Sequence, residues 1–301
     1  MVWHYERSTE LEGEFDVLIT LMADMITAQA RAGYVNVNAP AWSVDLHNLS
    51  MKLFKHLCSA RALLEPCGFR TPILPPYGYI DHSSVMVVTR SAIENYLVMH
   101  WLHANGDAAI RTFRHNVWVY GGWKKRSKLF ASTKEVKIGK QKAIEDAAAL
   151  LLLIEASPIY QAYHSDRKKQ LRQGNWQAGA PWNQLAEEAG LHRTYFTSIY
   201  PYLSGYVHSD FISSIQIGQA ADLSTQYDLA LSNIQIGLMV MGHFALFYAN
   251  LFPAAQAVLG GADAGRELVG KWSFKAEDMD FLYTSEDGDE VDRPQPGGGS
   301  S

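Results

Sequence analysis

The chain has 301 residues and a mass of 33.6 kDa, enough for one large domain or two modest ones with a sizeable apolar core. Hydrophobic residues make up 48% and charged residues 19%, which excludes a disordered, collagenous or disulfide-knotted chain. Its net charge of -5 argues by itself against a nucleic-acid partner. Because Cys58 and Cys67 provide neither a disulfide framework nor a metal cluster, and residues 1–7 lack a secretory signal pattern, we expect a cytoplasmic location.

Helical periodicity dominates the sequence. Apolar residues recur every three to four positions, and Gly or Pro separates the segments. The predicted long helices cover residues 10–32, 42–64, 82–103, 107 into the basic region, 143–155, 160–172 and 222–251, with short helices leading to Pro201. Residues 71–78 and 174–181 are predicted as loops, and 212–217 as a short extended piece. The predicted fold is all-α, an irregular helical bundle of about eight to ten helices.

The sequence suggests three parts. Residues 1–41 are expected to form an N-terminal helix and loop, 42–272 the helical core domain with the motifs, and 273–301 an acidic disordered tail. The tail ends in a Gly/Ser run typical of a flexible linker.

One segment, residues 234–251, is apolar enough to raise the question of a membrane span. It contains or adjoins Asn233, Gln235, His243 and Asn250, which are costly in hydrocarbon, and Lys or Arg anchors do not flank it. We therefore predict a buried core helix and no membrane partner.

Positive charge is concentrated in the middle of the chain. Residues 111–172 contain 14 Lys or Arg against 5 Asp or Glu, so this segment carries +9 and the remainder -14. Its densest part includes Lys124, Lys125, Arg126 and Lys128, which are the candidate nucleic-acid-binding residues. Phosphate contacts would hold a polyanion there; the alternative is a solvated helix face.

The predicted helix at 82–103 carries two charged residues, Arg90 and Glu94, among apolar neighbours. They lie four positions apart and share one helix face. Because buried charges must be paired, they form either a salt bridge that fixes helix packing or an anion-binding Arg held by a carboxylate in a cleft.

A second polar group lies near the end of the predicted core. Pro201 fits the first turn of a new helix, which would place Tyr200 near the cap and align it with Ser204 and His208 on one face. His208 is the preferred candidate for proton transfer, with Ser204 as its neighbouring hydroxyl. Alternatively, His208 is a hydrogen-bonded residue at a helix end with Asp210 as its cap or partner.

These two motifs carry a resemblance. A Thr-Arg-x-x-x-Glu helix (Thr89, Arg90, Glu94) followed by a Tyr-x-x-Leu-Ser-x-x-x-His helix resembles a widespread family of uncharacterised bacterial helical proteins, over residues 42–251. That family brings no established activity.

The chain is also similar, more broadly, to HEPN-type helical ribonucleases, which cut RNA without a metal through an Arg and a His on one helix. The sequence departs from that pattern because no Arg stands four to six positions before His208, so Arg90 would have to supply the cation from another helix.

A third signal competes with these two. Residues 182–196 resemble a DNA-binding helix-turn-helix, with Ala186 for close packing, Gly190 in the turn and Leu191 entering the core. The reading helix would offer His192, Arg193, Thr194 and Ser198. Its aromatic residues and the acidic pair at 187–188 favour a structural helical corner instead.

Other chemistry has no pattern in this sequence. His100 and His103 lie past Glu94, but a Glu-x-x-His pair, a dinucleotide fingerprint and a phosphate loop are absent, so we expect no metal and no cofactor. We therefore predict a site made by Arg90, Glu94, Tyr200, Ser204 and His208 for RNA or another phosphate-bearing ligand, with metal-independent RNA cleavage as its most concrete form. The alternatives are a non-enzymatic module that binds a protein partner, in defence or regulation, and a helix-turn-helix DNA binder.

Overall fold

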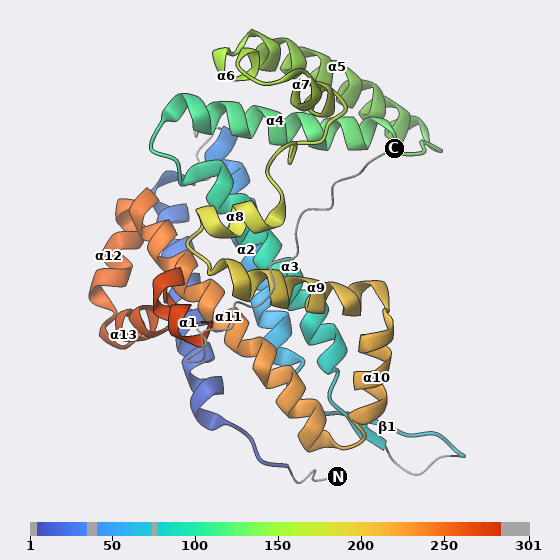
Figure 1. The fold of residues 1–301 in the computed structure, drawn as a ribbon, viewed down its shortest axis with the longest axis vertical. Coiled ribbons are helices and arrows are strands. Elements are labelled where there is room, and N and C mark those ends of the chain that lie inside the picture. Colours follow the sequence, from blue (N-terminus) through green and yellow to red (C-terminus); the bar gives the residue numbers. More distant parts are fainter. Residues whose placement is uncertain (1–4, 35–40, 74–76, 284–301) are drawn as a thin grey trace.

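The computed structural model describes residues 5–34, 41–73 and 77–283, and in these ranges the protein is all-α (Figure 1). The α-helices are α1 Thr9–Gln29, α2 Ala41–Ala62, α3 His82–His103, α4 Ala108–Ser127, α5 Lys134–Ala156, α6 Pro158–Gln161, α7 Ser165–Arg172, α8 Trp182–Glu188, α9 Arg193–His208, α10 Phe211–Gln219, α11 Leu223–Leu251, α12 Pro253–Gly261 and α13 Asp263–Trp272. A π-helix, Ala30–Tyr34, extends α1, and a 3₁₀-helix covers Ala276–Leu282. The described part thus has more helices than the eight to ten predicted, because several are shorter than three turns.

The main hydrophobic core is built around α11. Helices α1, α2, α3, α12 and α13 pack against it, and α9 packs on α3. Within the described residues α11 is the one helix long and apolar enough to cross a membrane, but most of its side chains are buried in this core. His243 Nε2 bonds to the Phe274 carbonyl and Asn233 Nδ2 donates to the Leu229 carbonyl, which offsets part of the cost of burying these side chains. The prediction of a buried core helix is confirmed.

Helices α4, α5, α6 and α7 form a lobe of their own, the α4–α7 lobe, at the top of Figure 1. A second, smaller hydrophobic cluster fills it, with Phe113, Val117 and Tyr120 of α4 against Ile154 and Tyr160. Because α4 ends at Ser127 and α5 begins at Lys134, the basic region forms the tip of a helical hairpin. The helix expected to run from residue 107 into the basic region is α4, whereas α5 begins before its predicted start at residue 143.

Several local predictions differ from the structure. Pro201 lies inside α9, which begins at Arg193, because burial of Phe196, Leu203 and Tyr206 offsets the backbone hydrogen bond that proline removes. The piece at 212–217, expected to be extended, belongs to α10.

Within the predicted loop at 71–78, strand β2 (Tyr77–Tyr79) begins and pairs antiparallel with β1 (Cys67–Phe69). The chain after α13, expected to start the disordered tail, is also ordered as far as residue 283. There the Tyr283 ring stacks on His192, at 4.6 Å between centroids. The rest of the expected tail, 284–301, lies outside the described residues.

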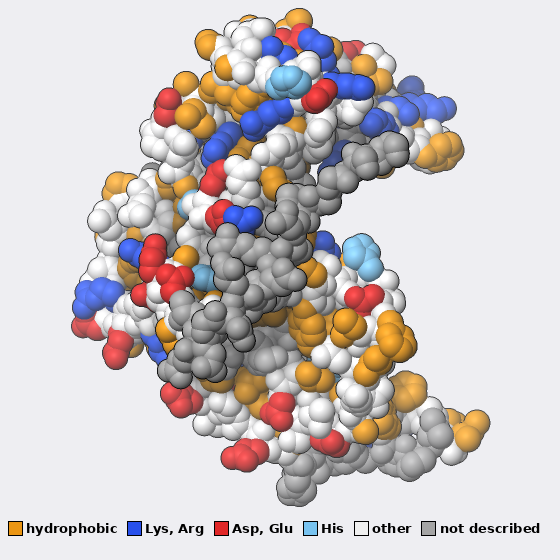
Figure 2. Space-filling model, in the orientation of Figure 1, with side chains coloured by type: hydrophobic (Ala, Val, Ile, Leu, Met, Phe, Trp, Pro, Cys, Tyr) orange, Lys and Arg blue, Asp and Glu red, His pale blue; other side chains and the backbone are white. Residues whose placement is uncertain are grey.

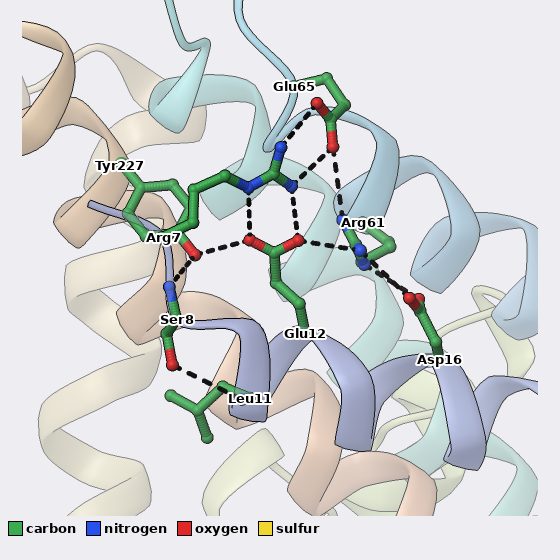
Figure 3. A network of polar contacts seen from close by, with 8 residues as sticks. All are labelled: Arg7, Ser8, Leu11, Glu12, Asp16, Arg61, Glu65 and Tyr227. Carbon is green, nitrogen blue, oxygen red and sulfur yellow. Dashed lines mark hydrogen bonds and ion pairs between the residues drawn. The ribbon is translucent and has the colours of Figure 1, made fainter. Parts of the chain in front are cut away.

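An ionic network fixes α1 to α2 and α11 (Figure 3). Its centre is Glu12, whose side chain is 7% exposed. Arg7 Nε donates to Glu12 Oε1 at 2.9 Å, Arg61 Nη2 lies 2.9 Å from Oε2, and the Tyr227 hydroxyl donates at 2.6 Å. Burial alone would raise the pKa of Glu12, but these partners outweigh it and lower the pKa. The carboxylate is therefore a buried charge with a full set of donors.

We expect Glu12→Gln to destabilise the fold by about 2–3 kcal/mol, because it leaves Arg7 and Arg61 half-buried without their shared carboxylate. Urea unfolding at neutral pH measures this loss. The matched control is Asp263→Asn, which removes an exposed pair with Arg266 and should cost less than about 0.5 kcal/mol.

The same variant should change the pH dependence of stability. A lowered folded-state pKa gives stability above the ordinary value of 4.5 that is lost as the pH falls through the folded pKa. Wild type should therefore lose more stability than Glu12→Gln between about pH 5 and 3. Parallel curves for the two proteins would contradict a central role for Glu12.

Candidate functional site

Helix α3 carries the first predicted site residues. Asp81 caps its N-terminus by accepting from the N–H of Ser84 at 3.0 Å, and most of its side chains are buried. Arg90 and Glu94 form an ion pair one turn apart, with Nη2 and Oε1 separated by 2.9 Å. Their side chains are 18% and 28% exposed, so the pair lies at the edge of the core.

Tyr200 of α9 completes this pair. Its hydroxyl donates to Glu94 Oε1 at 2.6 Å and accepts from Arg90 Nη2 at 3.0 Å, while the guanidinium carbon lies 5.1 Å from the centre of its ring. Burial and the hydrogen bond to Glu94 raise the pKa of Tyr200 to about 12, so the phenol stays protonated at neutral pH. Within this set the carboxylate receives two donors and balances the charge of Arg90.

Ser204 and His208 do not join the Arg90–Glu94–Tyr200 set. The Ser204 hydroxyl donates to the Tyr200 carbonyl at 2.7 Å, a bond within the helix. His208 is the exposed last residue of α9, two turns beyond Tyr200 and therefore roughly 12 Å along the axis. Asp210 caps α10 through the N–H of Ser213 and has no bond to His208 among the described residues. The structure thus brings together three of the five predicted site residues.

The candidate nucleic-acid-binding residues lie on the α4–α7 lobe. Lys124, Lys125 and Arg126 form the last turn of α4, and Lys128 is its C-cap. Within the described residues none of the four forms an ion pair with a carboxylate. Figure 2 shows Lys and Arg side chains gathered on this lobe, while Asp and Glu predominate on the opposite end of the molecule. The four charges are therefore available to an outside anion.

A cleft beside these cations was not predicted from the sequence. It has a volume of about 400 Å³ and is lined by Trp118 and Trp123 of α4, by Trp176 from the loop after α7, and by Lys125 and Arg126. We name it the tryptophan cleft. The three indole rings are only partly buried, and the Arg126 guanidinium carbon lies 5.6 Å from the Trp123 ring centre.

Other residues shape the same cleft. Gly121 allows the loop after α7 to approach α4, because a Cβ there would lie 2.9 Å from the Gly174 carbonyl oxygen. Asp45 is the acidic member of the lining, and its carboxylate is held by His115 at 2.8 Å. Trp118 and Trp123, which precede Lys124-Lys125-Arg126 in the sequence, are the signal that could have indicated this cleft.

The residues that resemble a helix-turn-helix form a helical corner. Ala186 and Leu191 are buried, and Gly190 has φ +83° in the turn. His192 caps α9, lies 3.3 Å from Asp280 and stacks on Tyr283, so it is covered by the end of the described chain. Arg193 pairs with Glu187 at 3.2 Å. Two of the four expected reading residues are thus already engaged within the protein.

The protein is therefore all-α, with the Arg90/Glu94 motif of α3 and the Tyr200 motif of α9 in contact, and with a basic α4–α7 lobe. Residues 78–220 match the model of a family described as a family of unknown function (DUF5677). The match confirms the resemblance to uncharacterised helical proteins and includes both motifs and the α4–α7 lobe; it does not extend to HEPN-type ribonucleases. No curated protein and no solved structure matches the chain.

We expect Tyr200→Phe to lower the free energy of unfolding by about 1–2 kcal/mol, because Glu94 loses a donor in a half-buried place. Thermal or urea unfolding measures the change. Tyr195→Phe is the matched control on the same helix, since its hydroxyl makes no hydrogen bond within the described residues. Equal stability of the two variants would contradict the closed Arg90–Glu94–Tyr200 set.

Proposed function

We propose that the protein binds single-stranded RNA on the α4–α7 lobe, with bases stacked in the tryptophan cleft and phosphates held by Lys124, Lys125, Arg126 and Lys128. The observation that carries the proposal is the placement of three partly exposed indoles beside cations that lack carboxylate partners. Proteins that bind single strands combine these two features, because stacking serves any base and cations follow the phosphate backbone.

The size of the tryptophan cleft supports this assignment. A volume of about 400 Å³ lies within the usual range for small-ligand pockets and accommodates one or two bases. Asp45 at its edge is held by a contact with His115 Nε2 at 2.8 Å. A single strand suits the tryptophan cleft better than a duplex does, because its unpaired bases are free to stack on the aromatic rings.

Cleavage of the RNA is the finer hypothesis from the sequence. It needs a proton donor or acceptor and a stabilising cation at one phosphate. Arg90 is engaged by Glu94 and Tyr200, and His208 lies two turns beyond Tyr200 along α9. Because the two groups are not placed to act on one phosphate, we propose binding of the strand rather than its cleavage. Incubation of RNA without metal, followed by gel analysis, separates binding from cleavage. Shortened RNA that depends on His208 would replace the binding proposal with the nuclease hypothesis.

The first test removes one stacking ring. We expect Trp123→Leu to weaken binding of a fluorescein-labelled uridine oligonucleotide by about 10- to 100-fold, because one base loses its aromatic partner. Fluorescence anisotropy measures the Kd. The control is Tyr77→Leu, which removes an exposed aromatic ring from β2, outside the lobe. Unchanged affinity of Trp123→Leu, with Tyr77→Leu equally unaffected, would exclude stacking in this cleft.

The second test measures phosphate contacts by salt dependence. Each phosphate contact to a single strand contributes about 0.7 to the slope of log K against log salt concentration. We expect the double variant Lys125→Gln, Arg126→Gln to flatten this slope by about 1.4. The double variant Lys52→Gln, Lys55→Gln removes two exposed charges from α2 and should leave the slope unchanged.

The same experiment includes a lipid arm. Leu129 and Phe130 at the hairpin tip are 62% and 90% exposed beside the cations, a pattern also suited to an anionic membrane surface. The proposal would be contradicted if vesicles containing phosphatidylserine bind the wild type but not Phe130→Ala, and the wild type does not bind RNA. Single-stranded DNA of the same length shows whether the sugar matters.

A further inference from the structure

A second cavity, which we name the histidine cavity, lies between the end of α3, the start of α4 and the second half of α11. Its volume is about 450 Å³. Tyr96, His100 and His103 come from α3, Arg111 from α4, and His243 and Phe247 from α11. Leu246 and Asn250 on its rim are exposed, so the cavity reaches the surface. It is separate from both the Arg90–Glu94–Tyr200 set and the tryptophan cleft.

One polar atom of this cavity lacks a partner. Within the described residues, His103 Nε2 is buried without a hydrogen bond, and His103 itself is 2% exposed. The rings of His100 and Tyr96 contact each other, at 6.0 Å between their centroids. Buried polar groups in proteins are usually paired, so an unpaired one in the wall of a cavity indicates a place for a polar ligand or water.

The charge of the histidine cavity favours an anion. Arg111 is its one charged lining residue, and no Asp or Glu is among the described residues that line it. Arg111 Nη1 donates to the carbonyls of Asn105 and Gly106, at 2.6 and 3.0 Å, and no carboxylate forms an ion pair with it in the described chain. Its positive charge is therefore uncompensated, with other N–H donors left over.

The imidazoles around the cavity are neutral at pH 7. Burial lowers the pKa of His100 to about 4 and of His103 to about 3, and it also lowers the pKa of His243. Around His100, the charge of Glu188 on α8 raises the pKa, whereas His243 on α11 and Arg114 on α4 lower it. A neutral imidazole offers one donor and one acceptor. The described residues contain no group of three His, Cys, Asp or Glu side chains placed to hold a metal ion.

We infer that the histidine cavity binds a small organic anion, a phosphate monoester or a carboxylate, with its oxyanion on Arg111 and His100 and its apolar part against the wall that Tyr96 and Phe247 form together. The cavity volume suits a ligand of nucleoside monophosphate size or smaller. The aromatic walls supply the apolar contact, while Arg111 supplies the charge-assisted hydrogen bonds that carboxylates and phosphates accept. The site is independent of RNA binding by the lobe.

Binding should be linked to proton uptake. An anion beside His100 raises the pKa of that imidazole, since it stabilises the charged form. The complex therefore binds more protons than the free protein, and affinity increases as the pH falls from about 7 to 5. Benzoate is a suitable probe because its carboxylate stays ionised in this range.

The experiment is calorimetric titration of the full chain with adenosine 5′-monophosphate, benzoate and adenosine, in two buffers of different ionisation enthalpy. We expect at least one of the two anions to bind, and adenosine to bind at least about tenfold more weakly than adenosine 5′-monophosphate. The two anions distinguish a phosphate from a carboxylate ligand. Failure of both anions at millimolar concentration, or equal affinity for adenosine and its monophosphate, would overturn the inference.

Variants locate the binding site. Arg111→Gln should weaken the anion that binds by about 10- to 100-fold, and Arg111→Lys should restore part of the affinity because it keeps the charge. His100→Gln should abolish proton uptake while changing the affinity at pH 7 by less than about threefold. The controls are the exposed residues in Arg193→Gln and His164→Phe. Circular dichroism melts show that each variant is folded, and anion affinity that is unchanged in folded Arg111→Gln would refute the site.

Discussion

The constraint on which this structure depends is that polar groups on the buried helix α3 must find partners inside the protein. Several of them do, although both ring nitrogens of His82 and Nε of Arg90 are buried without a partner among the described residues. Asn95 Nδ2 donates to the Leu49 carbonyl at 2.8 Å, Ser91 contacts His56 at 3.1 Å, and the Arg90–Glu94 pair is closed by Tyr200. Each bond joins α3 to a neighbouring helix, so satisfying α3 also fixes α2 and α9 around it. At its other end, His103 Nε2 is left without a partner.

The difference between paired and unpaired polar groups on α3 distinguishes residues that stabilise helix packing from residues that are available to bind a ligand. A polar set that is complete within the protein stabilises helix contacts, whereas an incomplete one beside a cavity leaves donors and acceptors for something else. The Arg90–Glu94–Tyr200 set is closer to the first kind, because Glu94 Oε1 receives both Arg90 Nη2 and the phenol, although Arg90 Nε is buried without a hydrogen bond among the described residues. The histidine cavity belongs to the second kind. The most conspicuous charges in the sequence are therefore less available chemically than three imidazoles with no motif around them.

Sequence patterns predicted the positions of helices better than they predicted which side chains lie close together in space. The pairing of Arg90 with Glu94 follows from their spacing, and the approach of Tyr200 was expected on the strength of two motifs in one chain. The separation of His208 was not, because Pro201 suggested a helix start and the burial of Phe196 and Leu203 carries α9 straight through it. Trp176 and His243 come from elements far from their cleft and cavity partners along the chain. Such juxtapositions depend on tertiary packing, which neither spacing nor periodicity encodes.

The lobe and the histidine cavity share one mechanical element, the turn between α3 and α4. Arg111 reaches back from the first turn of α4 to the carbonyls of Asn105 and Gly106, and so holds that turn closed. Two tryptophans of the cleft, Trp118 and Trp123, lie on the same helix, with Trp123 roughly 18 Å further along. Because α4 is continuous and packed along α5, the direction in which the basic tip points is set where the helix leaves the core. Arg111 is thus at once a wall of the cavity and part of the joint that orients the lobe.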